Sequence, residues 1–142
     1  MQVVNLKWAL PLAGAVFVAA AYLIWVMARD DAQHACVASV HAGLAQVTDI
    51  DPEGTGVEWR ILDERQSDRL ISIASKSHPF DCRALKPGEP LRDDWGNPLK
   101  VAVRRSPTGG PEYRVWSAGR DRGSGTWDDI VSPYGEKAMT PE

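Results

Sequence analysis

Hydrophobic positions dominate the first part of the chain, where 21 consecutive residues from Trp8 to Ala28 carry no charge. A helix of this length, rising 1.5 Å per residue, would span about 32 Å, which matches the hydrocarbon thickness of a bilayer. Trp8 lies at one end of the segment and Trp25 near the other, where amphipathic rings settle at the lipid headgroups. We therefore expect residues 8–28 to form a transmembrane helix that follows a short cytoplasmic tail at residues 1–7.

A cleaved signal peptide is the alternative for this segment, because Ala19–Ala21 offers a small-residue cleavage site after an apolar stretch. The apolar run continues past that site and only Lys7 precedes it, which favours an uncleaved anchor. Arg29, after the span, is followed at once by Asp30 and Asp31, so the charges predict a cytoplasmic N-terminus. The remainder of the chain is then expected in the periplasm or outside the cell.

The pattern after the span is that of an amphipathic helix, with apolar residues recurring on one face. These positions are Cys36, Val37, Val40, Leu44 and Val47. A run of turn-forming residues at 49–56 ends the pattern. The membrane helix is therefore expected to continue into an amphipathic half.

Alternation of apolar and polar positions predicts short strands at residues 57–62, 99–104 and 113–117. The last two form an antiparallel hairpin with a longer loop between them. A helix over residues 69–75 is expected between the first and second strands, capped by Ser67 or Asp68. The predicted class is α+β, with the amphipathic helix packed on a small antiparallel sheet. The side chains expected in the core are Val37, Val40, Leu44, Val101, Val103, Tyr113 and Val115.

Composition limits the partners and the chemistry of the part beyond the span. From Asp30 onward the chain has 14 basic and 19 acidic residues, a formal charge of −5, which argues against nucleic acid as a partner. Cys36 and Cys82 both fall in this part, where a disulfide is possible in an oxidising compartment; two buried thiols are the alternative. The three histidines and two cysteines have no metal-ligand or nucleophile spacing, and no catalytic motif is found. We expect no enzyme.

An acidic loop near the C-terminus carries the candidate chemistry. Asp121, Asp128 and Asp129 lie within nine residues, among glycines that let the backbone turn tightly. Hard cations such as Ca²⁺ are bound by several oxygen ligands on a flexible loop, so this composition suits Ca²⁺ better than zinc or copper. The spacing is not that of an EF-hand. On the residues alone, a solvated acidic turn with Asp128 capping its own backbone is the alternative.

Three segments together carry a resemblance to a known family. They are DWGNP at 94–98, YRVWSAGRD at 113–121 and GTWDDI at 125–130. They resemble the C-terminal domain of the major pseudopilin of type II secretion systems, whose pattern is roughly DPWGNP, YxIxSxGxDG and GTxDDI. The similarity covers about residues 90–133.

The resemblance implies a pilin-like fold at residues 29–133, a Ca²⁺ ion held by the carboxylates of Asp121, Asp128 and Asp129, and backbone oxygens near Ala118 as further ligands. Residues 134–142 are left as a polar tail. The family's glycine after the first aspartate is Arg122 here, which places a cation beside the proposed ion. Arg122 is expected either to point outward or to replace the metal by pairing with Asp128 or Asp129.

The N-terminal segment departs from the family, which has a basic leader, a glycine cleavage site and F-T-x-x-E at the start of the apolar helix. Gly14 is followed by Ala-Val-Phe-Val-Ala, and no glutamate occurs in the span. The expected protein is a pseudopilin-like structural component of type II secretion or a related envelope assembly, anchored in the bacterial inner membrane with its C-terminal domain in the periplasm. Its partners would be other copies or other secretion-system proteins. The alternative is a stand-alone anchored binding or adaptor module that does not polymerise.

Overall fold

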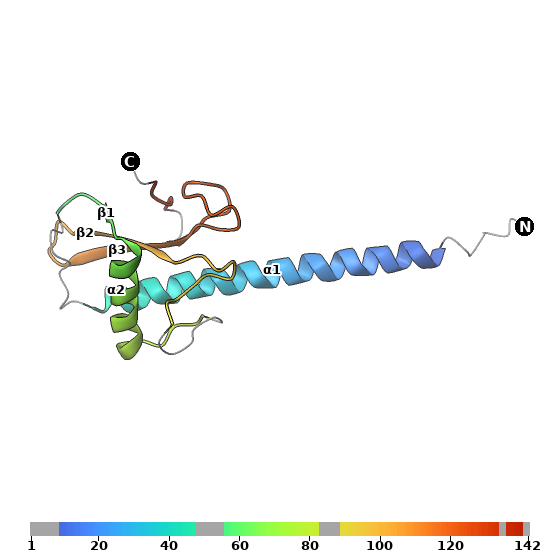
Figure 1. The fold of residues 1–142 in the computed structure, drawn as a ribbon, viewed down its shortest axis with the longest axis horizontal. Helices are drawn as coiled ribbons and strands as arrows, with labels where there is room; N and C mark the ends of the chain where they lie inside the picture. Colours follow the sequence, from blue (N-terminus) through green and yellow to red (C-terminus); the bar gives the residue numbers. More distant parts are fainter. Residues whose placement is uncertain (1–8, 48–55, 83–88, 134–135, 141–142) are drawn as a thin grey trace, which may run out of the picture. The chain divides into compact units, whose positions relative to one another are not determined.

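The computed structural model describes residues 9–47, 56–82, 89–133 and 136–140, with side chains from residue 15 onward. The chain divides into two compact units, Met1–Asp31 and Ala32–Glu142. The long helix α1, Ala9–Ala45, contributes its first part to one unit and its second part to the other (Figure 1).

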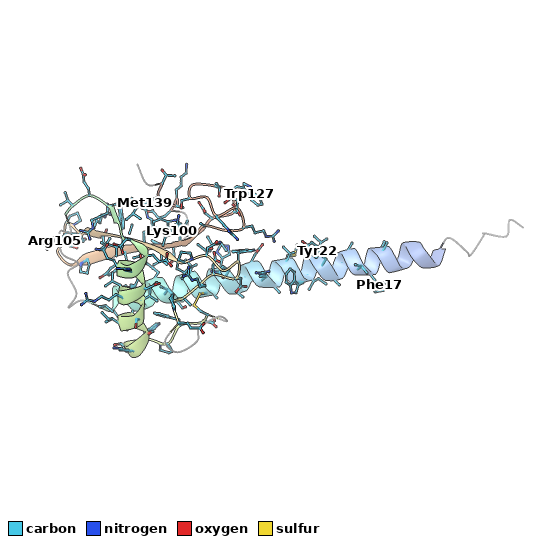
Figure 2. All side chains as sticks on the ribbon, viewed as in Figure 1. Phe17, Tyr22, Lys100, Arg105, Trp127 and Met139 are labelled. Atoms are coloured by element: carbon cyan, nitrogen blue, oxygen red, sulfur yellow. A yellow bond between two sulfur atoms is a disulfide. The ribbon has the colours of Figure 1, made fainter. Side chains whose placement is uncertain are left out.

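The first unit presents large apolar side chains around α1, each more than half exposed to solvent. They are Val16, Phe17, Val18, Tyr22, Leu23, Ile24, Trp25 and Met27. Tyr22 and Trp25 stack with their ring centroids 6.2 Å apart, and the Arg29 guanidinium lies 5.2 Å from the centre of the Trp25 ring. Figure 2 shows Phe17 and Tyr22 projecting from this part of the helix.

Within the described part of the chain, no helix combines the length and the apolar character needed to cross a membrane. The span predicted over residues 8–28 is therefore not confirmed. The predicted cytoplasmic tail at residues 1–7 and Trp8 lie outside the described residues.

The second unit is α+β, as expected, with the second part of α1 packed on a four-stranded antiparallel sheet. The strands are β1 (Arg60–Ile61), β2 (Lys100–Arg105), β3 (Pro111–Ser117) and β4 (Ile130–Ser132), in the order β1-β2-β3-β4. In the central pair, Val101 lies opposite Val115 and Val103 opposite Tyr113.

Four odd-numbered residues of β2 and β3, Val101, Val103, Tyr113 and Val115, share one core cluster with α1, because successive side chains of a strand point to opposite faces. The predicted core is confirmed; its members Val37, Val40, Leu44, Val101, Val103, Tyr113 and Val115 are all buried. The even-numbered residues of both strands lie on the other face, which includes Arg104, Arg114 and the fully buried Trp116.

The second helix differs from its prediction in length and in its cap. Helix α2 runs over Glu64–Ser77 and is capped by Asp63, whose side chain accepts a hydrogen bond from Gln66 N at 2.8 Å. The Gln66 side chain returns a bond to Asp63 N, which completes a capping box. Ser67 is a buried helical residue rather than the cap, so the prediction missed a polar first turn that carries no apolar periodicity.

Two strand predictions need correction. The first strand has only two residues, and Val57, expected in it, is exposed. Strand β4 was not predicted, because three residues next to an acidic loop give no alternating pattern; it pairs Ile130 with Ser117 and Ser132 with Val115. The predicted turn at residues 49–56 lies outside the described residues apart from Gly56.

The predicted polar tail is described in part, since residues 134–135 and 141–142 are outside the described residues. Glu136, Lys137 and Met139 contact residues on the even-numbered face of the sheet. Glu136 bonds to Arg114, and Met139 lines a cavity that Trp116 also lines. Figure 2 labels Met139 close to Lys100 of β2.

Candidate functional site

A buried carboxylate, Asp93, organises the region before the acidic loop. Its side chain is 3% exposed. Oδ1 accepts hydrogen bonds from Trp95 N at 2.9 Å and Asn97 N at 2.7 Å. Oδ2 accepts from Ser117 Oγ at 2.7 Å and Asn97 Nδ2 at 3.1 Å. Four donors on one buried carboxylate hold the Trp-Gly-Asn-Pro turn in a single conformation.

The same network reaches the start of the acidic loop. Asn97 Nδ2 also donates to Gly119 O at 2.9 Å, and Ser117 Oγ accepts from Gly119 N at 3.3 Å. Gly119 has a φ of +63°, and a Cβ there would collide with the Asp128 side chain. The turn and the loop therefore form one hydrogen-bonded unit at the end of β3. Within the turn, Gly96 has a positive φ of +82°, which a residue without a Cβ adopts freely.

Sequence reasoning missed Asp93 as the residue that organises this turn. The available signal was the turn itself, since aspartate characteristically bonds to backbone N–H groups two or more residues ahead.

Two of the three candidate metal ligands hold the loop by accepting backbone hydrogen bonds. Asp128 Oδ2 accepts from Arg120 N at 2.7 Å and Asp121 N at 3.3 Å. Asp121 Oδ1 accepts from Gly123 N at 2.7 Å. The Thr126 hydroxyl lies 2.8 Å from Asp128 Oδ1 and 3.3 Å from Asp121 Oδ1, and its single proton can serve only one of the two carboxylates fully.

The third carboxylate is only partly satisfied. Asp129 Oδ2 accepts from Gly125 N and Thr126 N, whereas Asp129 Oδ1 is buried with no hydrogen-bond partner. Desolvation is the main cause that raises the pKa of Asp129; the charges of Asp128 and Asp121 raise it further, and the two backbone bonds oppose them. For Asp128 desolvation also acts upward, but hydrogen bonds from Thr126 and from backbone N–H groups bring its pKa below the usual value.

The loop thus contains the predicted residues close together, in a hydrogen-bonded arrangement rather than a ready-made metal centre. Within the described residues, no three His, Cys, Asp or Glu side chains form a group that could hold a metal ion. Arg122 is exposed, has a φ of +61° and, among the described residues, forms no ion pair with Asp128 or Asp129. Of the two orientations expected for Arg122, the structure therefore has the outward one.

The cysteines form a disulfide, so of the two predicted alternatives the buried thiols are excluded. Cys36 of α1 is joined to Cys82, 46 positions later in the chain. A bridge of this kind persists in oxidising compartments and indicates an extracytoplasmic location.

The histidines of α1 lie in different surroundings. His34 is exposed, but His41 is half buried, and its Nε2–H donates to the Tyr113 carbonyl at 3.1 Å. Desolvation lowers the pKa of His41, although the bond to the carbonyl acts in the opposite direction.

Comparison of the chain with protein-family models, with curated proteins and with solved structures finds no match in any of the three.

Proposed function

We propose that this protein is an extracytoplasmic, pseudopilin-like structural component of a type II secretion system or a related envelope assembly, stabilised by Ca²⁺ at its C-terminal loop. The single observation that carries the proposal is the division of α1. Its second part contributes to the core of an α+β unit, while its first part exposes large apolar side chains around the helix.

Exposed apolar side chains of this number are unusual on a monomer and mark a surface that another molecule covers. In a helical assembly, the exposed apolar side chains of one copy would be buried against α1 of neighbouring copies. The disulfide supports a periplasmic location for the α+β unit, since such bridges are rare in the cytosol. The motifs at 94–98 and 113–130 support the choice of family.

Ca²⁺ fits the donors of the loop. Carboxylate and carbonyl oxygens are the ligands that hard cations take, and Asp129 Oδ1 is an acceptor left without a partner among three carboxylates. Asp121, Asp128 and Asp129 would hold the ion. Bound Ca²⁺ would screen the repulsion that contributes to the raised pKa of Asp129 and would stabilise the folded state by mass action.

The Ca²⁺ part is tested by thermal unfolding of the full chain in Ca²⁺, in Mg²⁺ and in chelator. At a Ca²⁺ concentration 100 times the dissociation constant, stabilisation of about 2.7 kcal/mol is expected. Asp129→Asn should lose this response, whereas Asp81→Asn, at an exposed carboxylate outside the loop, should keep it. Identical midpoints in Ca²⁺ and chelator would remove the metal from the proposal.

The assembly part is tested by a photo-reactive residue at Phe17, which is exposed on the first part of α1. Cross-linking in cells should give a ladder of multiples of the chain mass. A matched probe at Arg65, exposed on α2, should give none. A single adduct to a different protein at Phe17 would contradict self-assembly.

That last outcome would support the second candidate, an adaptor or binding module that does not polymerise. The specific observation in its favour is Trp127, which is 93% exposed at the tip of the acidic loop. Exposed tryptophans are frequent anchors of protein–protein contacts. A cross-linker placed at Trp127 would then capture the same partner as one placed at Phe17.

A further inference from the structure

The face of the sheet opposite α1 is covered by the chain's own C-terminal segment. Glu136 Oε2 accepts a hydrogen bond from Arg114 Nη2 at 2.5 Å, and Lys137 O accepts from Arg114 Nη1 at 3.4 Å. Three residues after Glu136, Met139 lines an apolar cavity of about 270 Å³ whose walls include Leu99 and Trp116. The segment therefore contacts the sheet through one acidic and one apolar side chain.

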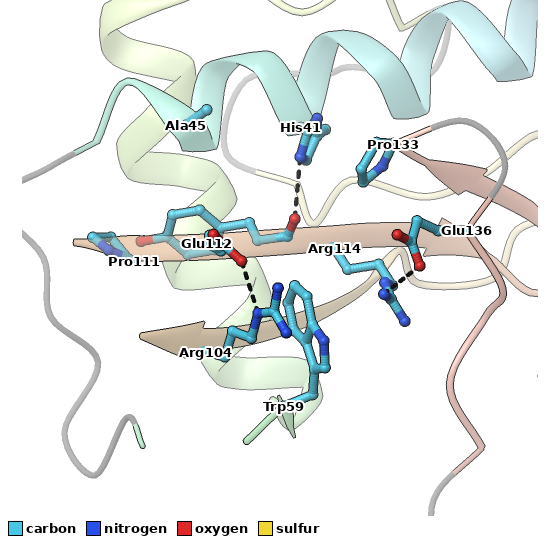
Figure 3. A pocket seen from close by; sticks show the side chains of 10 residues that line it. His41, Ala45, Trp59, Arg104, Pro111, Glu112, Arg114, Pro133 and Glu136 are labelled. Atoms are coloured by element: carbon cyan, nitrogen blue, oxygen red, sulfur yellow. Dashed lines mark hydrogen bonds and ion pairs between the residues drawn. The ribbon is translucent and has the colours of Figure 1, made fainter. Parts of the chain in front are cut away.

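Arg114 is held in an unusual environment for a charged residue. Its side chain is only 13% exposed, and its guanidinium carbon lies 4.6 Å from the centre of the Trp59 ring. The Arg104 guanidinium lies at the same distance from that ring and bonds to Glu112 at 2.7 Å. Together these groups form one wall of a second cavity of about 240 Å³ (Figure 3).

One donor in this cavity has no acceptor among the residues that the structure describes. Arg114 Nε is buried without such a hydrogen-bond partner, whereas Glu136 engages Nη2 and Lys137 engages Nη1. An unsatisfied buried donor costs about 1–3 kcal/mol, and more when the group is charged. Guanidinium groups prefer two parallel bonds to one carboxylate, and Glu136 supplies only one. The tail therefore leaves part of the binding capacity of Arg114 unused.

The hold of the tail on Arg114 is also weak. The Glu136 side chain is 49% exposed, and ion pairs with such exposure contribute about 0–1 kcal/mol. The tail occupies the site mainly because it belongs to the same chain, which gives it a local concentration in the millimolar range. A carboxylate that enters without this tether is free to approach Arg114 side-on and to accept from both Nε and Nη2.

We propose that this face is a docking site for an extended acidic segment of a partner protein, which the chain's own tail occupies in the isolated molecule. The segment presents a carboxylate to Nε and Nη2 of Arg114, and an apolar side chain three positions further on enters the cavity that Met139 lines. Trp59 forms a flat wall beside the carboxylate subsite. This inference does not depend on the proposed function, because it uses neither the exposed part of α1 nor the acidic loop.

Binding is tested with the full chain and a labelled peptide of the tail sequence, residues 133–142, followed by fluorescence anisotropy. Glu136→Gln in the protein weakens the tethered competitor, so the peptide should bind up to about fivefold more tightly than it binds the unaltered chain, the largest gain that loss of an exposed ion pair allows. The same peptide with glutamine in place of Glu136 should bind at least about tenfold more weakly, since it lacks the carboxylate.

Substitutions in the protein test the role assigned to Arg114. In the Glu136→Gln background, Arg114→Lys keeps the charge but removes the paired donors and should weaken peptide binding at least about tenfold. Arg65→Lys, at an exposed arginine on α2, is the matched control and should leave binding unchanged. If Arg114→Lys lowers the unfolding midpoint strongly, the comparison of the acidic and glutamine peptides tests the proposal instead, because that comparison uses a protein in which Arg114 is unchanged.

Equal affinity for the acidic and the glutamine peptides would overturn the proposal, and so would a Glu136→Gln protein that binds no more tightly than the unaltered chain. If the Glu136→Gln protein instead forms dimers in light scattering as its concentration rises and takes up no peptide, the face exchanges tails between copies. That outcome excludes a partner segment.

Discussion

Substitution of Asp93 tests whether a single buried carboxylate holds the turn and the loop together. Asp93→Ala removes four hydrogen bonds and leaves the backbone N–H groups of Trp95 and Asn97 and the hydroxyl of Ser117 without their acceptor. A buried donor without a partner costs about 1–3 kcal/mol. These costs are not additive, because the loop can relax and admit water, so we expect a total loss of about 3–5 kcal/mol.

Asp93→Asn separates the two halves of the network. Its Oδ1 can still accept from Trp95 N and Asn97 N, as in the parent. Its Nδ2 replaces the acceptor that faces Asn97 Nδ2 and Ser117 Oγ, and two donors then meet. We expect this variant to lose about 2 kcal/mol, between the parent and Asp93→Ala.

The measurement is urea unfolding of the full chain followed by tryptophan fluorescence, with Asp81→Asn as the control at an exposed carboxylate. The order of stability should be control, then Asp93→Asn, then Asp93→Ala, with unchanged slopes. If Asp93→Ala lies within about 0.5 kcal/mol of the control, the usual range for a surface substitution, the network does not hold this region and the argument from burial is wrong.

Three further substitutions test separate parts of the fold. Replacing both Cys36 and Cys82 with alanine opens a loop of 46 residues and should cost about 4 kcal/mol by the loop-entropy relation, measured against the parent with and without reductant. Arg122→Gly should raise stability by about 0.5–1 kcal/mol in thermal melts, because a non-glycine residue at φ +61° is strained; a loss would contradict this. His41 has a lowered pKa in the folded state through desolvation, so the unfolded chain binds more protons below its ordinary pKa and stability should fall as the pH is lowered through that range. His41→Gln should flatten the dependence of the unfolding free energy on pH. An unchanged dependence would show that another group causes it.

Sequence patterns predicted the parts of the fold in which buried residues recur at the regular spacing of a helix or a strand. Val37, Val40 and Leu44 repeat at helical spacing, and Val101 and Val103 alternate along a strand, so one buried face is visible in each. The hairpin of β2 and β3 follows from the same alternation. These elements can be predicted without knowing which other parts of the chain pack on them.

The parts that patterns did not predict depend on contacts far apart in the chain. Trp116 occupies an even-numbered position, which alternation assigns to solvent, yet it is fully buried because its face of the sheet is covered. Asp93 can be buried because its side chain bonds to Asn97 and to Ser117 of β3. Strand β4 is too short to show a period, and pairing with β3 alone defines it.

The acidic loop combines both kinds of information, which explains why its residues were predicted and their arrangement was not. Composition places three carboxylates together, and this proximity contributes to the raised pKa of Asp129. The folded loop directs three of the six carboxylate oxygens, Asp121 Oδ1, Asp128 Oδ2 and Asp129 Oδ2, to backbone N–H groups. A cation bound to the remaining oxygens would add to the stability that these hydrogen bonds supply. Because Asn97 joins the Asp93 network to Gly119, that stability extends back into the sheet.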